Sequence, residues 1–296
     1  MKFEPFDFES FPSYDAQIEG VIDVQGDIDN TKGRMIDVYY QEDCIIRFLL
    51  PDNASEPDRK YPLIVHVQGS GWYPQDMGDH VFDLFPLVKR GFVLAIVQYH
   101  GTPDFRFPTQ ITDVKKALRY IAAHAGEYPI DIDKVFLSGD SSGGNVAMLT
   151  LLTYNSGEWD TEDASVNTLP GLLGCMDFYG VMDLLSMDDW WSAFDHEEEH
   201  NIRDYLGSDY KNADLRKNAS PYWRLQEGMQ LPPVLILHGS KDAVVPFTQS
   251  LTMYEKMREY QYDVKLVRVY GANHGGPVFY SRNTYEEIFR FLEEKL

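Results

Sequence analysis

From Leu63 onward, short runs of consecutive apolar residues alternate with segments of helical periodicity. Leu63–Gln68 (LIVHVQ) and Phe92–Gln98 (FVLAIVQ) have the length of strands and are rich in β-branched residues. Strands that are apolar throughout are typical of parallel sheets that are covered on both faces. Further runs of this kind are Val135–Ser138, Leu172–Phe178, Val234–His238 and Val264–Val269, and the helical segments include Val81–Lys89, the stripe Ile111, Val114, Leu118 and Ile121, and Ser142–Tyr154. The sequence therefore predicts an α/β protein with a mostly parallel central sheet and helices on both faces.

Two segments depart from this alternation. Residues 1–60 read as an acidic arm with Pro and Gly, followed by a hairpin of Met35–Tyr40 and Cys44–Leu50 that leads into the sheet. The α/β domain is then expected over residues 61–296. Within it, the segment at about 181–231 is rich in Trp, Asp, Glu and His and is too long for a simple connection. We expect a helical, cap-like insertion after the sixth strand.

Composition narrows the classes of partner. The 296 residues contain 26 Lys and Arg against 47 Asp and Glu, a formal net charge of −21. Such a surface repels phosphate groups, which argues against binding to nucleic acid or to an anionic membrane. The first residues lack the apolar stretch of a signal peptide, and no apolar run approaches the ~20 residues of a membrane helix. A cytoplasmic location is expected, with Cys44 and Cys175 as buried free thiols.

A G-x-S-x-G motif occupies the junction between a predicted strand and a predicted helix. Gly139-Asp140-Ser141-Ser142-Gly143 follows Val135–Ser138 and leads into the helix that begins near Asn145. A nucleophile elbow requires this strand–turn–helix context, because a strained turn lifts the Ser hydroxyl clear of the sheet edge. The helix N-terminus also favours negative charge beside the serine. Ser141 is therefore the predicted nucleophile.

A serine nucleophile needs a base, and the base needs an acid that orients it. His274 lies in the Gly-rich loop after Val264–Val269, and Asp242 lies in the loop after Val234–His238. Both loops lie at the carboxyl edge of the predicted sheet, where the elbow also opens. The chain order Ser, Asp, His is that of α/β hydrolases. We predict His274 as the base and Asp242 as the acid, with Asp177 and Asp183 as rival acids.

The other histidines are weaker candidates. His66 falls within a strand and is expected to be a core residue, whereas His100 ends a strand and could line the site. His238 directly precedes a glycine at a strand end. The remaining four are expected at the surface: His80, His124, His196 and His200.

Acyl transfer also requires N–H donors for the oxyanion that develops on the substrate. One donor is expected from the backbone of Ser142, the residue after the nucleophile. The second is expected from the loop Gln68-Gly69-Ser70-Gly71-Trp72 after the first long parallel strand. Small residues there let the backbone turn its N–H groups inward, which makes Ser70 and Gly71 the candidates.

Together these residues resemble the α/β-hydrolase-fold serine esterases, close to the hormone-sensitive-lipase-like and BD-FAE-type carboxylesterases. The resemblance covers roughly Tyr61 to the C-terminus. It includes Phe107-Pro108, Asp113–Tyr120 (DVKKALRY), GDSSGGN, ILHGSKDAVVP and GANHGG. The usual His-Gly-Gly-Gly-Trp loop of these families has Gln68 in place of His and Ser70 in place of a Gly. Backbone donors can still point inward, and the Ser70 hydroxyl could add a third donor or narrow the acyl side.

The predicted activity is that of a serine carboxylesterase acting through an acyl-serine intermediate. Its small-molecule substrate is expected to be a short acyl or aryl ester, carbohydrate esters included, and no metal or organic cofactor is expected. Trp72 is a candidate substrate-binding residue. Trp190 and Trp191 are candidates too, although anchoring of the insertion explains them equally well.

Two alternatives to the esterase remain. An arylformamidase or a small amidase or peptidase would use the same three residues, because only contacts with the leaving group differ. A non-catalytic binding protein on the same fold is the second alternative, although such proteins typically lose one of the three residues.

Overall fold

The structure is a computed structural model that describes residues 33–53, 56–160, 169–187 and 199–296. The strands are β1 Gly33–Gln41, β2 Cys44–Pro51, β3 Tyr61–Val67, β4 Val93–Val97, β5 Ile130–Asp140, β6 Leu172–Phe178, β7 Val234–Gly239 and β8 Val264–Val269. The helices are α1 Val81–Lys89, α2 Thr109–His124, α3 Ser141–Leu152, α5 Glu199–Leu206, α6 Ala213–Asn218, α7 Pro221–Arg224, α8 Thr248–Glu259 and α9 Arg282–Glu293. The short 3₁₀ helices are η2 Ala125–Glu127 and η4 Pro277–Tyr280.

Among the described residues, the strands form one sheet in the order β1-β2-β4-β3-β5-β6-β7-β8. The pairs β1–β2 and β2–β4 are antiparallel, and all the others are parallel. The sheet is therefore mostly parallel, as predicted. Strand β5 begins earlier than expected, because Ile130 and Asp131 pair with Tyr61 and Pro62 before a register shift.

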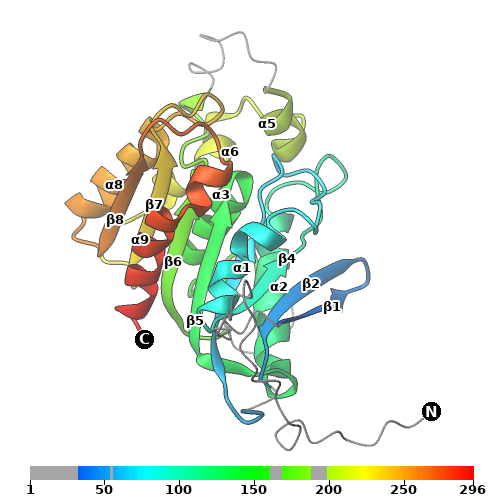
Figure 1. The fold of residues 1–296 in the computed structure, drawn as a ribbon. Helices are drawn as coiled ribbons and strands as arrows, with labels where there is room; N and C mark the ends of the chain where they lie inside the picture. The colour runs from blue at the N-terminus through cyan, green and yellow to red at the C-terminus, as the bar shows by residue number, and fades with distance from the viewer. Residues whose placement is uncertain (1–32, 54–55, 161–168, 188–198) are drawn as a thin grey trace, which may run out of the picture. The chain divides into compact units, whose positions relative to one another are not determined.

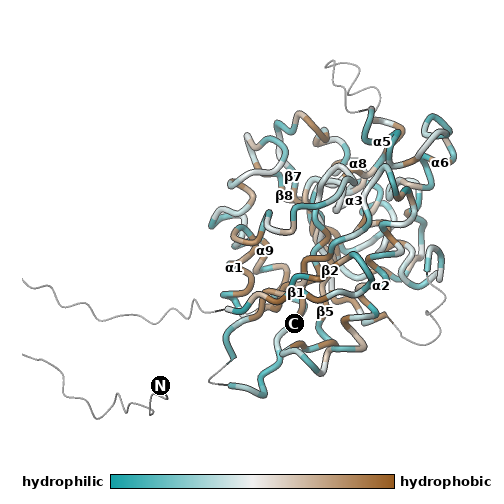
Figure 2. Tube along the Cα trace, turned by 90° about the vertical axis from the view of Figure 1, so that its right-hand side faces the viewer, coloured by the Kyte–Doolittle hydropathy of each residue, from teal (hydrophilic) through white to brown (hydrophobic). Residues whose placement is uncertain are grey.

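Helices cover both faces of this sheet (Figure 1). On one face, Val114 of α2, Leu149 of α3 and Met253 of α8 are buried in a single apolar cluster. On the other face, Leu84 of α1 and Phe291 of α9 belong to a second cluster. Apolar stretches gather along the strands, whereas hydrophilic stretches lie on the outer loops (Figure 2). This double cover explains why the parallel strands lack alternating polar residues.

The predicted hairpin belongs to the main sheet. Because β2 pairs with β4, the compact unit extends over Thr31–Leu296.

The predicted insertion also lies where expected, since α5, α6 and α7 all fall between β6 and β7. Its residues Trp190 and Trp191 lie outside the described part of the chain. In the part that is described, no helix is both long and apolar enough to cross a membrane. Cys44 and Cys175 are buried free thiols, as predicted.

Asn145 of α3 joins the insertion to the rest of the fold. Its side chain is fully buried, and its amide donates to the backbone oxygens of Val181 at 2.9 Å and Ala219 at 3.1 Å. Its Oδ1 atom accepts a hydrogen bond from the Trp72 indole at 3.3 Å. A single amide thus satisfies polar groups from three segments that meet behind the elbow helix.

We expect Asn145→Leu to lower the free energy of unfolding by about 2–4 kcal/mol, because an isosteric apolar side chain leaves these buried partners unsatisfied. Chemical denaturation followed by tryptophan fluorescence measures the change. Asn155→Leu is the control, because Asn155 is exposed just beyond the same helix. A loss no larger than that of the control would contradict the joining role of Asn145.

Candidate active site

Ser141 occupies a sharp turn between β5 and α3. Its backbone is left-handed, with a φ of 51°, which is strained for a residue with a side chain. The turn is possible because two glycines permit close packing around it. A Cβ atom on Gly139 would lie 2.3 Å from the Gly143 oxygen, and one on Gly143 would lie 2.1 Å from the Val67 oxygen. The local geometry is that of the nucleophile elbow expected from the sequence.

His274 lies within hydrogen-bond distance of both Ser141 and Asp242. Its Nε2 atom is 2.8 Å from Ser141 Oγ, and its Nδ1 atom is 2.7 Å from Asp242 Oδ2. With a proton on Nδ1 donated to the carboxylate, Nε2 is free to accept the serine proton. The structure thus brings together the three residues that the sequence placed on separate loops.

Asp242 is held as an anion by four donors. Its Oδ1 atom accepts the N–H groups of Val244 at 2.9 Å and Val245 at 2.8 Å. Its Oδ2 atom faces His274 and also lies 3.3 Å from His238 Nε2. Burial by itself raises the pKa of Asp242, but hydrogen bonds from His238 and His274 lower it to about 2. The carboxylate is therefore ionised at any pH at which His274 could act as a base.

His238 is a neighbour of the site whose role was not predicted. Its ring is fully buried, with Nε2 2.8 Å from the Val245 oxygen and Nδ1 2.7 Å from Ser250 Oγ. A proton on Nε2 satisfies both the Val245 oxygen and Asp242. The sequence did contain a hint of this contact. His238 and Asp242 are four residues apart, on either side of the turn that follows β7, and their side chains meet there.

The two rival acids are directed elsewhere. Asp177, at the end of β6, is fully buried and accepts a long 3.4 Å hydrogen bond from the Gly180 N–H. Burial raises its pKa to about 8. Asp183 Oδ1 accepts hydrogen bonds from the N–H of Leu185 and from the Trp223 indole. Neither carboxylate forms a hydrogen bond with His274.

The loop after β3 passes directly against the elbow, but its donors differ from the expectation. The N–H of Ser70 donates to Ser142 Oγ at 2.9 Å, so it is not free to bind an oxyanion. The Ser70 hydroxyl contacts the Tyr73 oxygen at 2.5 Å and the Tyr99 hydroxyl at 3.1 Å. This corrects the proposal that Ser70 supplies a donor or narrows the acyl side. Gly71 and Ser142 remain, and the Ser142 N–H lies in the first turn of α3, where no helical acceptor exists.

Helix α5 covers this loop. A Cβ atom on Gly71 would lie 2.8 Å from Asn201 Nδ2, so the Asn201 amide lies over the loop. The Tyr73 hydroxyl donates to Asp204 Oδ2 at 2.7 Å. Asn201 is a candidate substrate contact that sequence reasoning missed, because no local motif marks it.

Trp72 does not line the site. Its side chain is only 2% exposed and stacks on Tyr205 of α5, with ring centroids 4.4 Å apart. This corrects its assignment as a substrate-binding residue, because its ring faces are covered by protein.

The contacts of the other histidines show where each of them lies relative to the site. His66 is a core residue, as expected, with Nδ1 3.2 Å from Ser138 Oγ. His100 is held between the carboxylates of Asp43 and Asp113, each at 2.8 Å, and does not line the site. His80 was expected at the surface, yet its side chain is only 16% exposed and faces Asp140. His196, which was also expected at the surface, lies outside the described part of the chain.

Metal-binding side chains converge at one place among the described residues, where donor atoms of Asp43, Cys44 and His100 lie within 4.8 Å of one another. Both ring nitrogens of His100 already pair with carboxylates. Burial raises the pKa of Cys44 to about 11, which disfavours the thiolate that a metal needs. These residues fit a structural ion-pair cluster better than a metal site.

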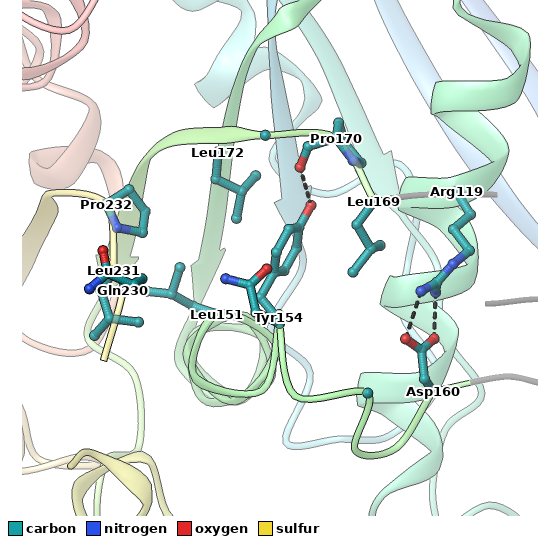
Figure 3. A pocket seen from close by; sticks show the side chains of 13 residues that line it. Arg119, Leu151, Tyr154, Asp160, Leu169, Pro170, Leu172, Gln230, Leu231 and Pro232 are labelled. Carbon is teal, nitrogen blue, oxygen red and sulfur yellow. Dashed lines mark hydrogen bonds and ion pairs between the residues drawn. The ribbon is translucent and has the colours of Figure 1, made fainter. Parts of the chain in front are cut away.

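A cavity of about 670 Å³ lies at the opposite edge of the sheet from Ser141. It is bounded by Leu172 at the start of β6, by Pro232 before β7 and by Tyr154 just after α3 (Figure 3). The Arg119–Asp160 ion pair forms one wall. A smaller cavity of about 370 Å³ lies beside Asp242 and is lined by Lys241, Pro246 and Phe247 among others.

Comparisons with known proteins find esterases among the relatives of this chain. Esterase LipQ of Mycobacterium tuberculosis is 28% identical over 211 residues, which are 71% of this chain and 48% of LipQ. Esterase LipC of the same organism is 25% identical over 232 residues, 74% of this chain and 54% of LipC. This chain therefore spans about half the length of the curated relatives it matches.

Solved structures share the fold. A truncated carbohydrate esterase from gut microbiota superposes with a TM-score of 0.77 at 22% identity, covering 92% of this chain and 99% of that one. Esterase B from Lactobacillus rhamnosus gives a TM-score of 0.74 at 18% identity, covering 88% of this chain and 85% of that one. The fold is thus the α/β-hydrolase fold.

The sequence profile of the BD-FAE family matches residues 48–257, a range that includes the elbow, the loop after β3 and Asp242. Since this range covers well over half of the chain, the protein belongs to the BD-FAE family.

Proposed function

We propose that this protein is a serine carboxylesterase that hydrolyses short acyl or aryl esters. The observation that carries the proposal is the unbroken series of contacts from Ser141 Oγ to His274 at 2.8 Å and from His274 to Asp242 at 2.7 Å. His274 takes the proton of Ser141 as its oxygen attacks the ester carbonyl carbon. Asp242 holds the ring in the required tautomer and stabilises the imidazolium. The imidazolium then protonates the departing alkoxide, which leaves an acyl-Ser141.

The second half of the reaction repeats the first with water. His274 accepts a proton from a water molecule that attacks the acyl-Ser141 carbonyl, and then returns the proton to Ser141. In both halves the oxyanion needs donors near the nucleophile. The N–H of Ser142 and the N–H of Gly71 are the proposed donors. No step in this sequence requires a metal or an organic cofactor.

The choice of an ester bond is supported by the relatives, whose names describe them as esterases. Carbohydrate esters are included in the proposal, because a carbohydrate esterase from gut microbiota shares the fold over almost its whole length. Asn201, which lies over Gly71, offers an amide for the alcohol or acyl part of a polar ester. The cover that α5 provides limits the space beside the carbonyl and favours short acyl groups.

The nucleophile is tested by a fluorophosphonate probe and an aryl acetate. We expect wild-type protein to be labelled and Ser141→Ala to be unlabelled, with kcat/KM lower by at least ~10³-fold. Ser156→Ala is the control, because Ser156 is an exposed serine beyond the far end of α3. Wild-type protein that neither reacts with the probe nor hydrolyses any ester would instead be a non-catalytic binding protein.

The acid is tested by Asp242→Asn. The Asn oxygen can still accept the N–H groups of Val244 and Val245, but its amide donates toward His274 and forces the wrong tautomer. We expect kcat to fall by about 10³–10⁴-fold with little change in thermal stability, as measured by steady-state kinetics and calorimetry. Activity within threefold of wild type would exclude Asp242 as the orienting acid.

The substrate class is tested by a panel of p-nitrophenyl acetate, butyrate and octanoate together with an acetylated sugar and an N-formyl anilide. We expect acetate and butyrate to exceed octanoate by about tenfold or more in kcat/KM, because overpacking a filled pocket costs ~1–3 kcal/mol. Asn201→Ala is expected to reduce the difference in kcat/KM between the short esters and octanoate, because it shortens the side chain that lies over Gly71. Faster turnover of the N-formyl anilide than of any ester would show that the protein is an arylformamidase or amidase.

A further inference from the structure

The carboxylate of Asp140, the residue before the nucleophile, connects the elbow to the loop after β3. Asp140 is buried, and its Oδ1 atom accepts the N–H of Gly69 at 2.8 Å. A Cβ atom on Gly69 would lie 2.6 Å from Asp140 Oδ2 and 2.8 Å from Ser141 Cβ. Asp140 thus fixes the position of Gly69 relative to Ser141. Gly69 lies two residues before Gly71 in this loop.

Two histidines also face the Asp140 carboxylate, one at each oxygen. His66 Nε2 lies 3.2 Å from Asp140 Oδ1, and His80 Nε2 lies 3.6 Å from Asp140 Oδ2. Burial raises the pKa of Asp140, but the contacts with these histidines more than offset burial and hold the pKa well below its usual range. Asp140 is therefore a buried anion that needs a positive partner.

His80 is in a position to be that partner. It lies just before α1 in a left-handed conformation, with a φ of 57°, and its ring is directed toward Asp140. Besides Asp140, two carboxylates face it: Asp79 of its own loop at 3.9 Å and Asp83 of α1 at 3.5 Å. The Tyr280 hydroxyl of η4 lies 3.3 Å from Nδ1.

The ring of His66 completes the surroundings of His80, with ring centroids 6.4 Å apart. Burial lowers the pKa of His80, but the carboxylates of Asp140, Asp79 and Asp83 outweigh it and raise the pKa to about 9. His80 is thus an imidazolium at neutral pH.

We propose that His80 is a positioning residue for the oxyanion donors: its imidazolium holds the Asp140 carboxylate, which in turn holds the Gly69 N–H and thereby the part of the loop that contains Gly71. The proposal rests on the proposed function of the site, because it concerns the donors that serve Ser141. His80 touches no reacting atom and acts only through Asp140.

A dependence on pH follows from this arrangement. The folded-state pKa of His80 lies above the ordinary imidazole value of ~6.5, so the ion pair is fully formed below that value. Its contribution is lost as the pH rises through about 9. Above that pH, Asp140 remains a buried carboxylate with less compensation, and the loop loses its fixed position. We expect kcat to fall in this range while KM changes little, because the donors act mainly in the transition state.

The kinetic test compares wild type with His80→Gln and with a matched control, His124→Gln. His124 also pairs with a carboxylate, Glu127 at 2.7 Å, but it lies at the end of α2 away from the site. At pH 7.5, His80→Gln is expected to lower kcat by about 10–100-fold with KM within threefold, and to abolish the alkaline decline. The control is expected to keep the wild-type profile. A His80→Gln variant with wild-type kcat and the same alkaline decline would overturn the proposal.

A second measurement on the wild-type protein does not depend on catalysis. In NMR spectra of protein with labelled histidine and glycine, the His80 ring is expected to titrate near pH 9, and the Gly69 amide resonance to shift with the same midpoint. In Asp140→Asn the His80 midpoint is expected to fall by about one pH unit or more. A Gly69 resonance that ignores the titration of His80 would overturn the proposal. If His80 and Gly69 titrate together in a protein that hydrolyses no ester, the proposed esterase activity is refuted, whereas the contact between His80, Asp140 and Gly69 is supported.

Discussion

The close approach of β3 and α3 at Ser141 is the constraint on which the rest of the site depends. The strained φ of 51° at Ser141 is stable only because Gly143 lets the helix start pack against the Val67 oxygen. That packing places the loop after β3 beside Ser141, and the parallel order of β5, β6, β7 and β8 brings the later loops to the same edge. The geometry at Ser141 thus follows from the sheet topology and from the close packing that Gly139 and Gly143 allow because they have no side chain.

Two buried aspartates near this edge show how donors decide charge. Asp242 receives two backbone N–H groups and faces two histidines, and its pKa falls to about 2. Asp177 is fully buried and has a single long hydrogen bond, from Gly180, so burial together with the nearby charge of Asp140 raises its pKa to about 8. In a chain with a net charge of −21, a buried carboxylate stays ionised only where the fold supplies specific donors. This difference explains why the loop after β7, rather than the end of β6, carries the proposed acid.

The sequence predicted what depends on local pattern. Apolar runs located the strands. The elbow motif and the chain order selected Ser141, Asp242 and His274, which the structure brings into contact. The predictions from sequence were wrong where a side chain is surrounded by segments that are distant along the chain. Trp72 was expected to face substrate, but Tyr205 of the insertion covers its ring. His80 was expected in solvent, but the carboxylate of Asp140 lies opposite it, and no periodicity in the sequence relates those two residues.

The contacts around the elbow also bear on where specificity can arise. The side chains of the loop after β3 are already committed: Gln68 donates to the Asp76 oxygen, Ser70 bonds Tyr73 and Tyr99, and Trp72 stacks in the core. These contacts hold the loop in place, and the one polar atom among them without a hydrogen-bond partner, Gln68 Oε1, is buried. Helix α5, by contrast, presents the Asn201 amide over Gly71. Substrate choice is therefore expected to depend on the insertion between β6 and β7, while the sheet and its loops fix the chemistry.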